Sequence, residues 1–147
     1  MNMKLLIAST LLLFSTVLAQ ANVVLPDVIG PAMVLQRDRP VPIWGQADAG
    51  EVVTVRFAGQ LKKTVAGPDS KWLLRLDPLH TNASSATMTI SGKNTIELKD
   101  ILVGEVWLVA GQSNMQRLLS ETANGEAAIA AADQPLIRLF FQQLRIP

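Results

Sequence analysis

Ser113 stands at the end of a short apolar run, Val106-Trp107-Leu108-Val109-Ala110, from which Gly111 and Gln112 separate it. Such a run is typical of a strand buried on both faces, and Gly111 allows the sharp turn that a Cβ would resist. The pattern predicts a serine just past the carboxyl end of a strand and near the start of a helix, where backbone N–H groups can stabilise an oxyanion. The spacing leaves two interpretations open, because Ser113 is either a nucleophile or an ordinary helix cap, a role that Asn114 could also fill.

A serine hydroxyl becomes a nucleophile when a neighbouring histidine, oriented by a carboxylate, takes its proton. The chain has one histidine, His80, in the turn-rich stretch 76–82, and we expect it to be an exposed loop residue. Glu105 lies at the far end of the expected strand, about 25 Å from Ser113 at the rise of a β-strand, which favours a structural role.

The block Gly111-Gln112-Ser113-Asn114-Met115, after Glu-Val-Trp-Leu, resembles the nucleophile block of the SGNH hydrolases, in particular the sialate O-acetylesterases and related carbohydrate acetylesterases. Gln112 stands where the wider superfamily more often has Asp, and this residue points to the carbohydrate-esterase branch. The segments at 25–27, 33–37, 41–45 and 94–102 are similar in order and character to the amino-terminal part of sialate O-acetylesterases. The resemblance covers nearly all of the chain after the first residues, but only the front portion of the family's length.

This resemblance implies a carbohydrate O-acetylesterase with Ser113 as the catalytic nucleophile, an O-acetylated carbohydrate as substrate and no cofactor. Gly111, Gln112 and Asn114 are implied as substrate-binding or oxyanion residues. The resemblance also places the catalytic histidine and its acidic partner near the carboxyl end of a longer chain. We therefore expect this sequence to be an incomplete and inactive fragment of the enzyme.

Two alternatives stay open. The first is a non-catalytic exported β-sandwich that binds a glycan or another partner. The second keeps the acetylesterase but changes its substrate to acetylated xylan or another polysaccharide. The sequence also leaves the oligomeric state open.

Residues 1–21 begin with a charged start, continue with an apolar stretch from Leu5 to Leu18 and end in Ala19-Gln20-Ala21. This arrangement is typical of a secretory signal peptide, so we expect the mature protein to begin at Asn22. The alternative is a membrane-spanning helix, but the stretch is interrupted by Ser and Thr and is shorter than the ~20 apolar residues that a bilayer needs. Export to the periplasm or exterior of a bacterium also fits the lack of cysteine.

Charge and cysteine content exclude several classes of function. The chain has 13 basic and 12 acidic residues, a formal net charge of +1, and this balance gives no electrostatic basis for binding nucleic acid or, after signal cleavage, a membrane. Without cysteine there is no thiolate nucleophile, disulfide framework or cysteine-based metal site. We expect no metal.

The fold is predicted in two parts. Residues 22–100 alternate apolar and polar side chains between turn residues, and this pattern predicts a β-sandwich. Residues 101–147 are predicted to open an α/β domain of the flavodoxin-like SGNH type, truncated after one strand–helix–strand unit. One such unit cannot bury both faces of a parallel sheet. The predicted strands of the first part are 33–37, 41–46, 51–57, 61–65, 71–76, 86–91 and 94–98.

Inside the second part we expect a buried strand at 106–110, an alanine-rich helix at 124–132 and a further strand at 136–142. Asn124 could cap the helix. Trp44, Trp72 and Trp107 all fall within apolar, strand-like runs, so we expect all three to pack in the core rather than stack on a sugar.

Overall fold

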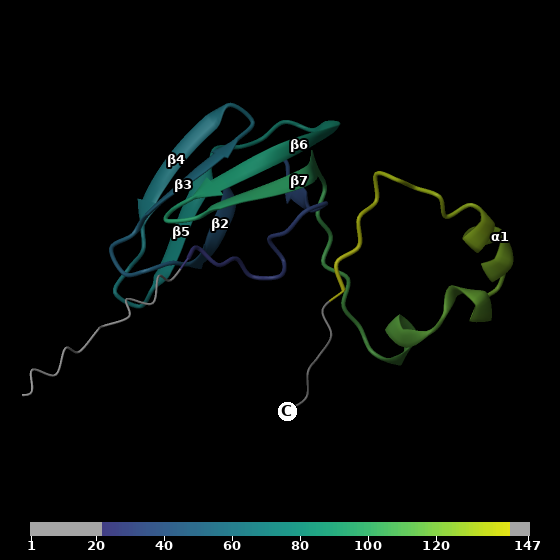
Figure 1. Cartoon of the computed structure of the whole chain (residues 1–147). Coiled ribbons are helices and arrows are strands. Elements are labelled where there is room, and N and C mark those ends of the chain that lie inside the picture. The colour runs from purple at the N-terminus through teal and green to yellow at the C-terminus, as the bar shows by residue number, and fades with distance from the viewer. Residues whose placement is uncertain (1–21, 142–147) are drawn as a thin grey trace, which may run out of the picture.

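The computed structural model describes residues 22–141 and consists mostly of strands, with few helices (Figure 1). Residues 22–104 form a β-rich part, and residues 105–141 form a segment that contains short helices but no strand. The elements are β1 Val34–Gln36, β2 Val41–Gln46, β3 Val52–Phe57, β4 Gln60–Val65, β5 Lys71–Leu76, β6 Asn82–Ser91, β7 Thr95–Gly104, the 3₁₀ helices η1 Ser113–Gln116 and η2 Leu119–Glu121, and α1 Gly125–Ala130.

Two sheets make up the β-rich part. The larger sheet has the strand order β1-β7-β6-β3-β4, and the smaller one pairs β2 with β5. β1 runs parallel to β7, whereas the other pairs are antiparallel. The larger sheet curls so that β4 comes beside β5, where Lys62 Nζ lies 2.6 Å from the Asp77 carboxylate. This ion pair ties one edge of the larger sheet to the smaller sheet.

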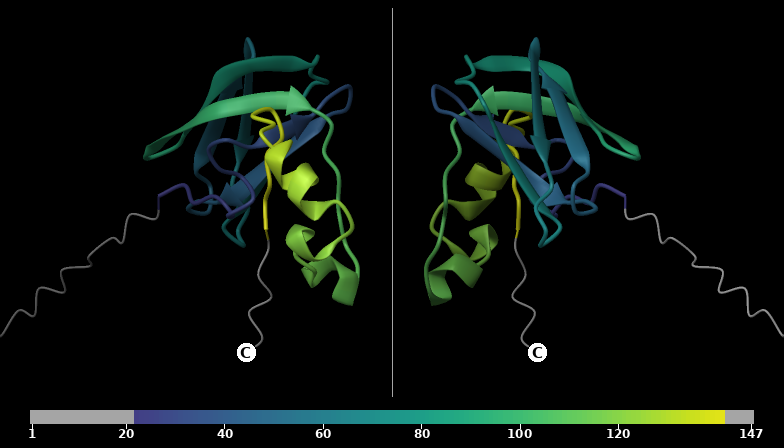
Figure 2. Two further views of the ribbon diagram at one scale, coloured as in Figure 1. Left: turned by 90° about the vertical axis from the view of Figure 1, so that its right-hand side faces the viewer. Right: turned by 90° about the vertical axis from the view of Figure 1, so that its left-hand side faces the viewer.

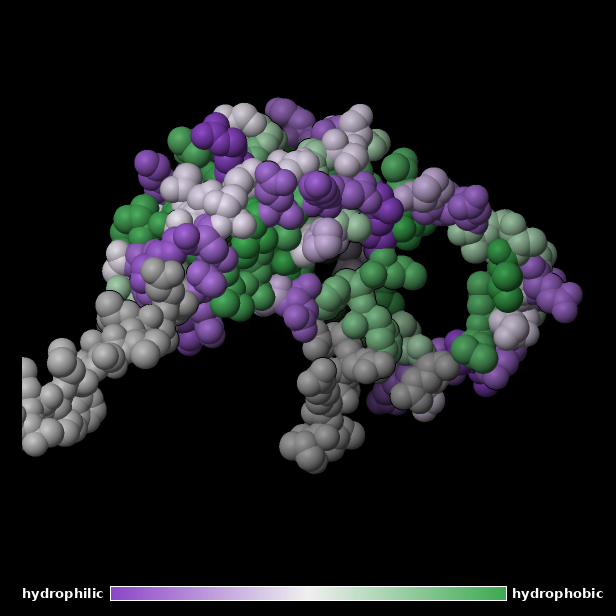
Figure 3. Space-filling model, viewed as in Figure 1, coloured by the Kyte–Doolittle hydropathy of each residue, from purple (hydrophilic) through white to green (hydrophobic). Residues whose placement is uncertain are grey.

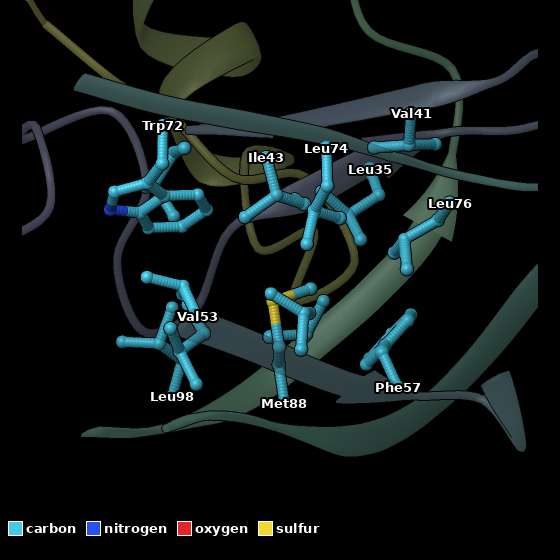
Figure 4. Close-up of a cluster of buried hydrophobic side chains, with 14 of the residues drawn as sticks. Leu35, Val41, Ile43, Val53, Phe57, Trp72, Leu74, Leu76, Met88 and Leu98 are labelled. Atoms are coloured by element: carbon cyan, nitrogen blue, oxygen red, sulfur yellow. The ribbon is translucent and has the colours of Figure 1, made fainter. Parts of the chain in front are cut away.

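The core lies between these two sheets. Burial alternates along β2 and β5, so every second side chain points inward. Figure 4 shows the inward side chains of both sheets meeting in one apolar cluster. The largest fully buried side chains are Phe57, Ile43, Leu76, Met88, Ile90, Ile101, Val53 and Val55.

The strands predicted in residues 22–100 all form. β2 and β5 have the predicted bounds, but β6 begins earlier, at Asn82, and β7 continues to Gly104, through the predicted module boundary at residue 100. A bulge explains the misplaced end of β7. Asp100 has φ 60°, and the register between β6 and β7 shifts between the pairs Met88–Leu98 and Ala86–Ile101. The extra residue breaks the alternation from which the strand end was predicted.

The strand–helix–strand unit predicted after residue 100 is wrong. Residues 106–110 form no strand, and the Val106 N–H donates to the Gln36 side-chain oxygen at 2.9 Å. Residues 136–141 form no strand either, and Gln142 lies outside the described residues.

The predicted helix does form, as α1, within the predicted range. Asn124 precedes it in the left-handed conformation, with φ 60°, and makes no side-chain capping hydrogen bond. Asn124 thus occupies the predicted N-cap position, and its carbonyl oxygen accepts from the Ala128 N–H, but its side chain does not cap the helix.

Within residues 22–141, no helix has the length and apolar character needed to cross a membrane. The predicted signal peptide, residues 1–21, lies outside the described part of the chain.

Candidate functional site

Ser113 is the first residue of η1 and is exposed. Ser113 lies within a turn from Gln112 to Met115, which is closed by the Met115 N–H donating to the Gln112 carbonyl oxygen at 2.8 Å. Gly111 lets Met115 pack over this turn, since a Cβ at residue 111 would come within 2.6 Å of Met115 Cγ. The chain thus places the serine on a tight turn, as predicted, but this turn begins a single 3₁₀ turn and follows no strand.

The residues next to Ser113 form no hydrogen-bonded catalytic group with it among residues 22–141. Gln112 and Asn114 are exposed, and neither side chain makes a hydrogen bond among residues 22–141, nor does the Ser113 hydroxyl. The roles of Gly111, Gln112, Ser113 and Asn114 therefore stay predictions.

His80 lies in the loop after β5, as predicted, and its side chain is 99% exposed. Its Nδ1 atom lies 3.9 Å from Asp38 Oδ1, and no hydrogen bond joins it to Ser113 in the described structure. His80 is therefore not positioned to take the proton of Ser113.

A polar cluster of Gln36, Arg37 and Glu105 holds the point where the segment of residues 105–141, which contains Ser113, leaves β7. Glu105 Oε1 accepts a hydrogen bond from Arg37 Nε at 2.7 Å, and Glu105 Oε2 accepts one from Gln36 Nε2 at 3.0 Å. The hydrogen bond from Gln36, followed by that from Arg37, lowers the pKa of Glu105. In return, the hydrogen bond and charge of Glu105 raise the pKa of Arg37. This is the structural role predicted for Glu105.

A second ion pair brings the segment back to the β-rich part. Arg138 Nη2 lies 3.0 Å from Asp100 Oδ2, at the bulge of β7. Figure 1 shows the chain leaving β7, passing through α1 and returning toward the strands, and Figure 2 shows the same path from the side. Sequence reasoning missed both ion pairs, because their partners are 68 and 38 residues apart along the chain and no local pattern links them.

The segment carries a large exposed apolar surface. Trp107, Leu108 and Leu139 are 81%, 95% and 93% exposed. Many large apolar side chains exposed along one segment indicate a face that another part of a protein covers. A hollow of about 300 Å³ at the base of the segment is lined by Gln36, Arg39, Glu105, Val106 and Trp107, and Ser113 is not among its lining residues.

The prediction that all three tryptophans pack in the core is correct only for Trp72, which is 3% exposed. Trp107 is exposed because its predicted strand does not form. Trp44 is 39% exposed, since the alternation in β2 turns Ile43 inward and therefore turns Trp44 outward.

The residues that the structure describes contain no group of three or more His, Cys, Asp or Glu side chains that could hold a metal ion.

Comparison with known proteins finds relatives that are named sialate O-acetylesterases. The chain is 36% identical over 120 residues to the sialate O-acetylesterase of Rattus norvegicus, covering 74% of this chain and 22% of the rat protein. It is 36% identical over 103 residues to the sialate O-acetylesterase of Homo sapiens, covering 63% of this chain and 20% of the human protein. The chain thus spans about a fifth of the length of the curated relatives it matches.

A solved structure agrees with the sequence relatives. The fold is similar to that of a carbohydrate acetylesterase from Xanthomonas citri, with a TM-score of 0.72 and 32% identity, over 77% of this chain and 26% of that one. The chain matches no protein-family profile.

Proposed function

Over the region that it shares with these relatives, the chain belongs to the sialate O-acetylesterase family, and we propose that the protein is a carbohydrate O-acetylesterase that removes acetyl groups from sugar hydroxyls. The observation that carries this proposal is the 36% identity to the rat enzyme over 120 residues. The similar fold of the Xanthomonas citri acetylesterase supports it.

In the proposed mechanism, the Ser113 hydroxyl attacks the acetyl carbonyl, and the sugar hydroxyl leaves as an acetyl-enzyme forms on the serine oxygen. Water then attacks this ester, releases acetate and restores the serine. The Ser113 backbone N–H contributes to holding the oxyanion. The general base is a histidine from a part of the enzyme outside the matched region, since His80 makes no contact with Ser113.

We propose that the two sheets are the β-sandwich module of this enzyme and that residues 105–141 belong to its hydrolase domain. Two findings support this division. The relatives are about five times as long as the part they share with this chain, and the apolar side chains of the segment, such as Leu108 and Leu139, are exposed. Strands and helices of the complete hydrolase domain would bury these side chains.

We also propose that the protein is exported to the periplasm or the exterior of a bacterial cell. The support is the sequence of residues 1–21, with its charged start, apolar middle and Ala-x-Ala ending.

The test is to extend this chain, in frame, with the part of the Xanthomonas citri acetylesterase that follows the matched region. We expect the purified, folded chimera to release acetate from O-acetylated sialic acid or acetylated xylan, whereas the unextended chain releases none above background. The two substrates distinguish the sialate type from the polysaccharide type. A chimera that is folded by circular dichroism and gel filtration but releases acetate from neither substrate contradicts the proposal.

A further inference from the structure

A groove of about 760 Å³ runs beside the two-stranded sheet of β2 and β5. It lies on the β-rich part, and neither Ser113 nor any other residue of the 105–141 segment lines it. Its volume is within the range of sites that bind small molecules. Figure 3 shows apolar side chains gathered on the lower part of the β-rich region and bordered by hydrophilic ones.

One side of the groove is an aromatic surface. Trp44 points away from the core on β2, is 39% exposed and lies directly across from Leu73 of β5, which is 46% exposed. An exposed indole is large, flat and apolar, and it packs well against another flat apolar surface. The pair forms a platform of the shape that the C–H face of a pyranose ring requires.

The rim of the groove is polar and carries no net charge. Gln46 extends from the end of β2, and its register partner Lys71 extends from the start of β5, with Lys71 Nζ 3.9 Å from Asp69 Oδ2. Both charged side chains are mostly exposed, so their hydrogen-bonding capacity is available. An amide, a carboxylate and an ammonium group together donate and accept hydrogen bonds, which suits the hydroxyl groups of a neutral sugar.

From these observations we propose that the groove is a glycan-binding site for the pyranose rings of a neutral oligosaccharide. One ring stacks on Trp44, and its hydroxyl groups bond to Gln46, Asp69 and Lys71. The site is separate from Ser113 and would hold a polymeric substrate on the β-rich part.

The experiment titrates the 147-residue chain with xylohexaose and with cellohexaose, and follows tryptophan fluorescence and ¹H–¹⁵N NMR shifts. We expect saturable binding of at least one oligosaccharide in the millimolar range or tighter. The shifted amides should belong to β2, β5 and residues 24–26. This measurement requires no acetate release, so its outcome is independent of the proposed enzymatic activity.

The variants Trp44→Ala and Trp107→Ala test whether the sugar binds at the groove or at any exposed tryptophan, because each removes one exposed tryptophan and only Trp44 lines the groove. We expect Trp44→Ala to weaken binding at least about tenfold, as for a central aromatic contact, and Trp107→Ala to leave it unchanged. Trp44→Phe should restore part of the affinity that Trp44→Ala loses, because it keeps an aromatic ring at this position.

Three results would overturn the proposal. The first is the absence of binding to either oligosaccharide up to about 10 mM. The second is binding that persists unchanged in Trp44→Ala. The third is a concentration-dependent dimer in analytical ultracentrifugation that Trp44→Ala abolishes, which would assign the groove to a second copy of the chain.

Discussion

The Glu105 carboxylate lies 2.7 Å from Nε of Arg37, and this ion pair joins the end of β7 to the turn after β1. The Arg37 N–H also donates to the Gly104 carbonyl oxygen at 2.9 Å, so backbone and side chain act at the same point. The path of the chain toward Ser113 is therefore set by contacts made by residues near the end of β1.

The Glu105 contacts predict a dependence on pH. The pKa of Glu105 is lowered from its ordinary value of 4.5, first by the hydrogen bond from Gln36 and then by that from Arg37. A lowered carboxyl pKa stabilises the folded arrangement above the ordinary value, and this contribution is lost as the pH falls through the lowered value. We expect the protection of the Val106 amide in hydrogen exchange to be constant near neutral pH and to fall in this acidic window.

The Glu105→Gln variant should show reduced Val106 protection already at neutral pH, with no further loss on acidification. Glu126→Gln is the control, because Glu126 lies in α1 and forms no ion pair among the described residues. Equal protection of Val106 in the wild type and in Glu105→Gln would show that the carboxylate does not hold the segment.

Gly45 is expected to tolerate no side chain. A Cβ there would overlap the Val24 carbonyl oxygen and press on the Trp72 ring, so Gly45→Ala should reduce the free energy of unfolding by about 1–3 kcal/mol. Gly30→Ala is the matched control, since its Cβ would meet only the Asp27 carbonyl oxygen, at an ordinary 3.6 Å. Urea unfolding measures both variants, and an equal effect of the two substitutions would contradict the packing described here.

Phe57 and Phe141 give opposite expectations for the same substitution. Phe57 is 1% exposed and Phe141 is 83% exposed. Phe57→Ala should cost about 3–5 kcal/mol of unfolding free energy, whereas Phe141→Ala in the unextended chain should stay within about 0.5 kcal/mol of the wild type. A large loss of stability in Phe141→Ala would show that residues 105–141 are packed in this chain.

Export predicts a defined amino terminus. If residues 1–21 are a signal peptide, the intact mass of the protein recovered from the periplasm or medium of an expressing bacterium should correspond to a chain that begins at Asn22. Protein that keeps Met1 and stays in the membrane fraction would contradict this prediction.

The sequence predicted the β-rich part well, because its strands are half-buried and each shows its inward face as an alternation, as in Val53, Val55 and Phe57. It failed where burial depends on distant parts of the chain. Residues 106–110 have the composition of a buried strand, but a strand needs neighbours for its backbone groups, and no described strand pairs with them.

The outward position of Trp44 was predictable in principle, because the alternation of β2 that buries Val41 and Ile43 turns Trp44 to the other face. The ion pairs of Glu105 and Arg138 were not, since they depend on how β1 and the β7 bulge bring distant residues together. At the candidate site, the turn that carries Ser113 was predicted from sequence, whereas the partners of Ser113 were not within reach of any local pattern.

The central claim is that Ser113 is the nucleophile of a carbohydrate acetylesterase, and the most direct measurement is acetate release by serine variants of the extended chimera. Ser120→Ala is the matched control, because Ser120 is an exposed serine of the same segment, in η2. We expect Ser113→Ala to lower kcat by at least about a thousandfold while the protein stays folded, and Ser120→Ala and His80→Ala to keep nearly full activity. Near-normal acetate release by Ser113→Ala, or inactivation of a folded His80→Ala protein, would contradict the account.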